Sequence, residues 1–125
     1  MDMYGSAVYD EAESTFKLWY TRYSVPFGTS GCYATSPDGI NWRKPALGLV
    51  DFQGSKANNL IHWLGMGMIH SPNNPNANAR YKARGGKSAV VSADGLTWKT
   101  RDGSADIPGD VASDCVIPFC YDELS

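Results

Sequence analysis

The chain has 125 residues, of which 42% are hydrophobic and 19% charged, and its formal net charge is −2. This length suits one ordinary domain, and the weak negative charge argues against strong binding to nucleic acid or to an anionic membrane surface. No apolar run reaches the roughly 18 residues of a membrane span. Thirteen glycines and seven prolines, with no sustained helical spacing of apolar residues, predict an all-β chain.

An internal repeat organises the sequence. Residues 36–42 (SPDGINW) recur as residues 92–98 (SADGLTW), a shift of 56 positions. At twice that shift, a second echo joins the two ends of the chain: Asp2, Tyr9, Asp10 and Glu11 reappear as Asp114, Tyr121, Asp122 and Glu123. Two echoes with one period indicate two full units and the opening of a third.

Each unit is predicted to be a meander of four short strands. The first unit is expected to contain a strand over residues 3–9, a turn at 10–14, strands over 15–23 and 31–36, and a short fourth strand that begins at Trp42. Between the third and fourth strands, Pro37, Asp38 and Gly39 have the residue preferences of a tight turn.

The second unit repeats this plan with a longer, Asn-rich first turn at residues 72–79. Its strands are expected over residues 66–69, 80–84, 88–92 and 98–101. The third unit offers one strand, Cys115–Tyr121.

Four-stranded units with a period of 40–60 residues are typical of β-propellers. The fold class predicted is therefore all-β, a β-propeller fragment with two four-stranded antiparallel blades plus the first strand of a third. Residues 1–57 would form blade 1 with its connector, 58–109 blade 2, and 110–125 the inner strand of the incomplete blade. Five such blades need about 280 residues, so we expect a piece of a longer protein or, alternatively, a ring completed by self-association through open blade faces.

The chain resembles the five-bladed propeller glycoside hydrolases of the arabinanase, invertase and mannoside-phosphorylase type. The likeness rests on YDEAESTFKLWYTRYS, YATSPDGINWRKPALGLVDFQGSKANNLI, ARYKARGGKSAVVSADGLTWKT and GDVASDCVIPFCYDELS. It implies a sugar-processing pocket at the axis of a five-bladed ring. The Asn-Asp-Pro-Asn segment of invertases and an Arg-Asp-Pro of the third blade are absent, so the family's catalytic positions are not carried over.

Glycoside cleavage uses two carboxyl groups, one as acid and one as base or nucleophile. Asp2 and Asp114 precede the predicted innermost strands of their blades, where equivalent positions converge on one axis. We therefore predict both as catalytic residues, with at most part of the acid/base set present in this chain. The alternative is that both cap turns by accepting hydrogen bonds from nearby backbone amides.

The substrate-binding candidates are polar or aromatic residues in the loops that join blades. Asn58 and Asn59 end the connector 51–59 and have amides suited to sugar hydroxyls, or else satisfy backbone groups of the connector. Asp110 could bind a hydroxyl or serve a turn, and Trp63 could stack on a sugar ring.

Structural roles are expected for several other residues. Asp38 and Asp94 are expected to stabilise turns, and Trp42 and Trp98 to wedge between blades. A solvated position is predicted for the hairpin acids and for the basic residues of the second strands: Asp10, Glu11, Asp122, Glu123, Lys17, Arg80, Lys82 and Arg84. The three cysteines, Cys32, Cys115 and Cys120, lack the spacing of a metal site and are expected to be buried small residues.

The function predicted is that of a carbohydrate-active propeller fragment, inactive as an isolated piece. The alternative is a propeller that binds or scaffolds without catalysis. A carbohydrate is the expected ligand, with no metal or other cofactor, no nucleic acid and no membrane partner.

Overall fold

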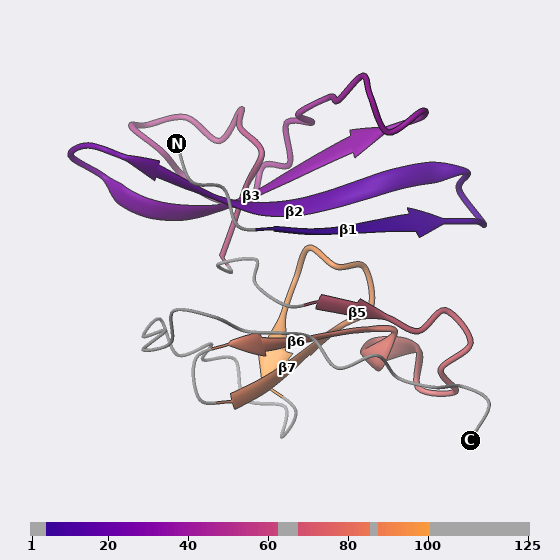
Figure 1. Cartoon of the computed structure of the whole chain (residues 1–125). Coiled ribbons are helices and arrows are strands. Elements are labelled where there is room, and N and C mark those ends of the chain that lie inside the picture. The colour runs from indigo at the N-terminus through magenta and orange to yellow at the C-terminus, as the bar shows by residue number, and fades with distance from the viewer. Residues whose placement is uncertain (1–4, 63–67, 86–87, 101–125) are drawn as a thin grey trace. The chain divides into compact units, whose positions relative to one another are not determined.

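The computed structural model describes residues 5–62, 68–85 and 88–100. The chain divides into two compact units, Met1–Met66 and Gly67–Ser125. Each contains one four-stranded antiparallel sheet (Figure 1). The prediction of an all-β chain with two such sheets is confirmed, while the arrangement of the sheets as propeller blades stays a prediction. No helix among the described residues has the length and apolar composition needed to cross a membrane.

The first sheet has the strand order β1-β2-β3-β4. Its strands are β1 (Gly5–Asp10), β2 (Thr15–Ser24), β3 (Gly28–Ser36) and β4 (Leu60–Ile61). In the register of β2 and β3, Trp19 lies opposite Tyr33 and Tyr20 lies opposite Cys32. Because successive side chains of a strand point to opposite faces, these two pairs lie on opposite faces of the sheet.

The face that carries Tyr20 and Cys32 holds a hydrophobic cluster with Ala34 and Leu60. Val50 and Phe52, from the connector between β3 and β4, pack against this cluster. On the other face Trp19 is fully buried, and its ring centroid lies 5.2 Å from that of Tyr33. Both faces therefore carry buried aromatic side chains.

The fourth strand of the first sheet differs from the prediction. Arg43 forms one isolated bridge with Thr35, and the pairing then stops. Pro45 follows two residues later, and proline has no N–H to donate to a ladder. The sheet edge is instead completed by β4, whose Leu60 lies opposite Cys32. The prediction of a fourth strand beginning at Trp42 is therefore wrong for this unit, and β4 lies beyond residue 57, where blade 1 was predicted to end.

The second sheet has the strand order β5-β6-β7-β8. Its elements are β5 (Met68–His70), the 3₁₀ turn η1 (Ala77–Ala79), β6 (Tyr81–Gly85), β7 (Ser88–Ser92) and β8 (Lys99–Thr100). Here the fourth strand does follow the tryptophan directly. The pair Val91 and Lys99 stands at the same repeat positions as Thr35 and Arg43, so the units share this register. The strand predicted over 115–121 lies outside the described residues.

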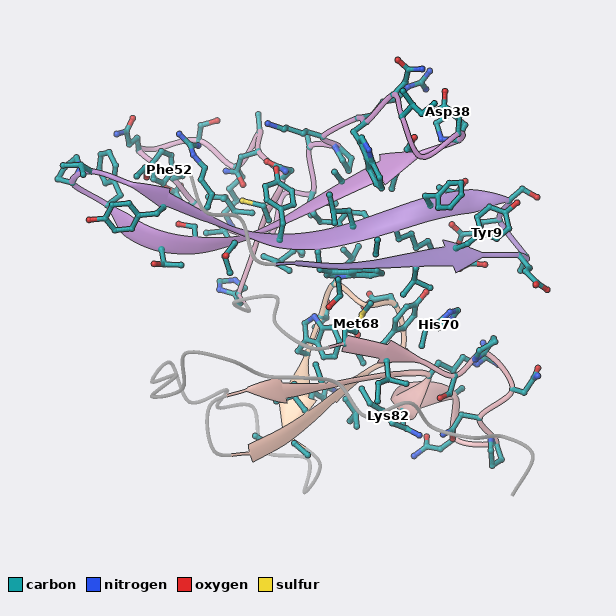
Figure 2. The ribbon with its side chains drawn as sticks, in the orientation of Figure 1. Tyr9, Asp38, Phe52, Met68, His70 and Lys82 are labelled. Carbon is teal, nitrogen blue, oxygen red and sulfur yellow. The ribbon has the colours of Figure 1, made fainter. Side chains whose placement is uncertain are left out.

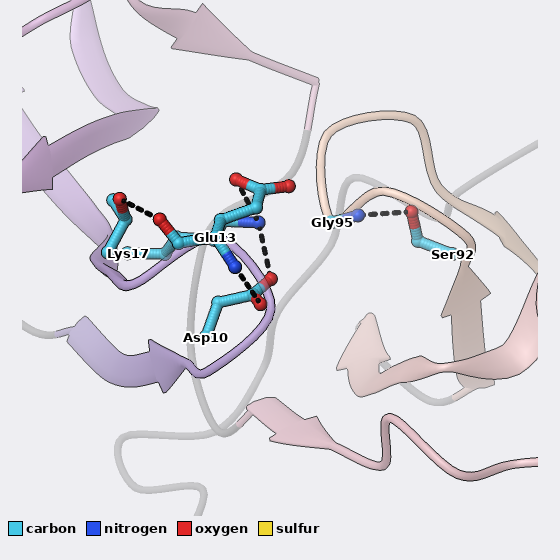
Figure 3. Close-up of polar contacts among 6 residues, drawn as sticks. Asp10, Glu13, Lys17, Ser92 and Gly95 are labelled. Carbon is cyan, nitrogen blue, oxygen red and sulfur yellow. Dashed lines mark hydrogen bonds and ion pairs between the residues drawn. The ribbon is translucent and has the colours of Figure 1, made fainter.

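A buried ion pair stabilises the β1–β2 hairpin (Figure 3). The Lys17 ammonium lies 2.8 Å from the Asp10 carboxylate and 3.1 Å from that of Glu13, and the side chains of Lys17 and Asp10 are both nearly inaccessible. The Glu13 backbone amide also donates to Asp10. The prediction that Asp10 and Lys17 are solvated is therefore wrong, because the two opposite charges compensate each other's burial.

Candidate functional site

Four of the predicted site residues lie outside the described residues: Asp2, Trp63, Asp110 and Asp114. Their roles as catalytic or substrate-binding groups stay predictions. Of the residues predicted to contact substrate, the structure describes Asn58 and Asn59.

The Asn58 side chain links parts of the connector between β3 and β4 to one another. Its side-chain amide donates to the carbonyl oxygens of Val50 and Ser55 at 2.9 and 3.0 Å, and its Oδ1 accepts from the Leu60 amide at 3.0 Å. All of these partners belong to the connector or to the start of β4. The side chain thus positions Val50 against the sheet, and contact with a glycan stays a prediction.

Asn59 ties the connector to the sheet. Its Nδ2 donates to the Tyr20 hydroxyl at 3.0 Å and to the Tyr33 carbonyl at 2.7 Å. The Tyr33 amide in turn donates to the Asn59 carbonyl at 2.9 Å. These bonds place β4 at the edge of β3, and they use both amide hydrogens of the side chain.

The connector that these asparagines hold forms one wall of a hollow of about 380 Å³. Phe27, from the β2–β3 turn, and Phe52, from the connector, meet edge to face with ring centroids 5.0 Å apart. Phe27 is half exposed. Ser30 and His62 supply polar side chains to the lining, and His62 Nε2 lies 3.2 Å from the Leu49 carbonyl oxygen. The hollow therefore combines an aromatic wall with a polar rim, a combination common in small-ligand sites.

This hollow lies at the end of the first sheet opposite to the Asp38 turn, as the labelled Phe52 and Asp38 show in Figure 2. It is lined by β3 and β4, whereas the predicted channel strand β1 is at the other edge of the sheet order. Phe27 and Phe52 were not among the predicted site residues, although an aromatic residue directly after Pro26 in a turn was an available signal for Phe27.

The two repeated turns have nearly identical hydrogen bonds. Asp38 Oδ1 accepts from the Ser36 hydroxyl at 2.9 Å and from the amides of Ile40 and Asn41 at 2.9 and 2.7 Å. The second turn shows the same three bonds to Asp94 Oδ1, from Ser92, Leu96 and Thr97, at 2.9, 2.8 and 2.9 Å.

The glycine and the tryptophan of the turn also act alike in both copies. Gly39 and Gly95 have φ of 74° and 77°, in the left-handed region, and their amides donate to the serine hydroxyl at 2.9 Å (Figure 3 shows the second copy). The indole N–H of Trp42 and of Trp98 donates to the carbonyl of that glycine at 3.2 and 3.0 Å. The predicted turn role of both aspartates is thus visible in their contacts.

These contacts lower the pKa of both carboxyl groups. Backbone and side-chain hydrogen bonds from Asn41, with those from Ile40 and Ser36, hold the pKa of Asp38 far below its usual value. Partial burial opposes the ionisation of Asp94, but the hydrogen bonds from Thr97, Leu96 and Ser92 together outweigh it, so its pKa is lowered as well.

We expect Asp94 to contribute stability that disappears in acid. Its pKa is lower in the folded than in the unfolded chain, so the contribution is present above about pH 4 and is lost as the pH falls through the folded pKa. The melting temperature of the wild type should exceed that of Asp94→Asn at pH 7, and the difference should shrink toward pH 2. Calorimetric melting curves of both proteins over this range check the prediction, and parallel curves would contradict it.

Comparisons with known proteins identify no family for this chain. No family model matches it, and no solved structure matches it. Over 57 residues it is 39% identical to Exodeoxyribonuclease I of Buchnera aphidicola subsp. Acyrthosiphon pisum (strain APS), a match that covers 43% of this chain. The match spans 14% of the length of that protein.

The described residues contain no group of three or more His, Cys, Asp or Glu side chains arranged to hold a metal ion. Cys32 is buried with a free thiol, and burial raises its pKa.

Proposed function

We propose that the chain is a sector of a carbohydrate-active β-propeller of the glycoside hydrolase-like type. The observation that carries the proposal is the recurrence of one hydrogen-bonded turn, Ser-x-Asp-Gly-x-x-Trp, at the same place in two four-stranded antiparallel sheets. Repeated four-stranded units of this size are the building blocks of propellers.

The first-unit hollow supports a carbohydrate as the ligand class. Sugar rings present C–H faces that pack on aromatic side chains, and their hydroxyls need hydrogen-bonding groups at the rim. Phe27 and Phe52 supply the former, and Ser30 and His62 the latter.

The match to Exodeoxyribonuclease I does not suggest a second function. It spans 14% of that protein, and the present chain has a net charge of −2, which does not favour binding to a polyanion.

Binding of the full 125-residue chain to a panel of immobilised oligosaccharides, with a hydrolysis assay on the same panel, tests the proposal. We expect binding to at least one glycan and no release of reducing sugar, because a five-bladed ring needs about 280 residues. If no glycan binds, the proposal is overturned. Hydrolysis that is lost in Asp114→Asn would overturn the expectation of an inactive sector and place the chemistry within this chain.

A further inference from the structure

The two repeated turns differ at one position that decides what the aspartate can bind. In the first turn, Asn41 Nδ2 donates to Asp38 Oδ2 at 2.7 Å, so both carboxylate oxygens have partners. In the second turn, Thr97 stands at the position of Asn41. Asp94 Oδ1 accepts the same three hydrogen bonds as Asp38 Oδ1, but no residue in the described part of the chain donates to Asp94 Oδ2.

Asp94 borders a hollow of about 370 Å³ that the Asn-rich loop helps to form. Its lining includes Asn76 and Asn78 from this loop, and Thr97 and Lys99 from the segment that leads into β8. Ten residues, 71–80, separate β5 from β6, against four between β1 and β2. The first unit therefore has no corresponding loop beside Asp38.

Most polar side-chain groups that line this hollow have no hydrogen-bonding partner among the described residues. Asn76 Oδ1 accepts from the Asn78 backbone amide at 3.0 Å. The side-chain NH₂ group of Asn76 has no hydrogen-bonding partner among the described residues. Within residues 5–62, 68–85 and 88–100, the side chains of Asn78, Thr97 and Lys99 have no hydrogen-bonding or ionic partner. By contrast, Asn58 and Asn59 each donate two hydrogen bonds from the side-chain NH₂ group in holding the connector.

The composition of the hollow selects a neutral ligand rich in hydroxyls. A free carboxylate oxygen accepts hydroxyl hydrogens, while amide and ammonium groups donate to hydroxyl oxygens. One carboxylate and one ammonium balance in charge, which favours neither a cation nor an anion. Val91 adds apolar surface to the lining, and the volume is at the lower end for small-ligand sites.

We propose that the hollow bordered by Asp94, Asn76, Asn78, Thr97 and Lys99 binds one neutral sugar residue. A hydroxyl of the sugar donates to Asp94 Oδ2, and the two amides and Lys99 donate to neighbouring hydroxyl oxygens. This inference rests on the proposed function, since it names where a glycan contacts the second unit.

The test is an NMR titration of the full chain with methyl α-D-mannopyranoside and methyl α-L-arabinofuranoside, using inorganic phosphate as a charged comparison. We expect the sugar-dependent shifts to include the amides of residues 76–78 and 92–99. Thr97→Asn restores the donor that Asn41 provides in the first turn, so it should occupy Oδ2 and weaken sugar binding by about tenfold or more. The matched control Asn41→Thr should leave sugar binding unchanged.

Both variants place a residue that one copy of the turn already contains, so the turn is expected to fold in each. The indole N–H signal of Trp98, which reports its bond to the Gly95 carbonyl, checks this for Thr97→Asn. If the glycosides bind but shift only amides elsewhere, or bind Thr97→Asn as well as wild type, this inference is overturned and the proposed function stands. A response to phosphate alone at this hollow also overturns it, and failure of the chain to bind any glycan overturns both.

Discussion

Replacing Trp19 by alanine is expected to lower the free energy of unfolding of the first unit by about 3–5 kcal/mol. Trp19 is the largest fully buried side chain among the described residues, and it lies in the central part of β2 opposite Tyr33. Its removal takes away a large buried apolar side chain and ends the contact between the rings of Trp19 and Tyr33, whose centroids lie 5.2 Å apart. Urea denaturation followed by far-ultraviolet circular dichroism measures the loss.

Ile40→Ala is the matched control for this substitution. Ile40 is 80% exposed in the Asp38 turn, so its truncation should change the free energy of unfolding by less than about 0.5 kcal/mol. If Trp19→Ala cost no more than Ile40→Ala, the burial of Trp19 would not contribute to stability, and the packing described for this face would be wrong.

Replacing Lys17 by alanine is expected to cost about 3–5 kcal/mol, because it leaves the buried Asp10 carboxylate without its cation. Removing both charges together in Lys17→Met/Asp10→Leu should cost much less than Lys17→Ala, since neither variant side chain then needs a charged partner. Urea denaturation of the two variants and of the wild type measures both values.

Glu13→Ala provides the control for the Lys17 prediction. Glu13 also contacts Lys17, but its side chain is 64% exposed, so its loss should cost less than about 1 kcal/mol. Equal losses in Lys17→Ala and in the double variant would contradict the prediction, because removing the Asp10 charge would then recover no stability even with a methionine in place of the lysine stem.

The turn chemistry was predictable because it is local. Ser, Asp, Gly and Trp at fixed spacing interact within seven residues, and the same bonds form in both copies whatever surrounds them. The aromatic and β-branched residues of 15–23 likewise predicted β2, because such side chains favour the strand conformation itself. The fourth strand of the first sheet was predicted wrongly, at Trp42. Pro45 ends the pairing there, and β4, more than a dozen residues later in the sequence, pairs with β3 at the edge of the sheet instead.

The candidate sites depended more strongly on residues distant in sequence. Asn59 was predicted to face a ligand because it is a polar residue in a connector. Its partners Tyr20 and Tyr33 lie 39 and 26 positions away, and the sequence contains no signal for such contacts. The burial of Lys17 was not predicted for a related reason. A lysine on a strand is expected to be solvated, and its partner Asp10 lies seven positions away across a hairpin.

By itself the sequence determined the all-β class, the 56-residue repeat and the geometry of the aspartate turn, because each depends on interactions between near neighbours. Only the tertiary structure decided which strand completes the first sheet and which asparagines hold the connector. It also decided that, among the described residues, no side chain donates to the second carboxylate oxygen of Asp94 beside the Asn-rich loop. Those outcomes depend on how chain segments compete for the same sheet edge and the same hydrogen-bonding groups. Packing between residues that are distant in the sequence decides which segment forms each contact.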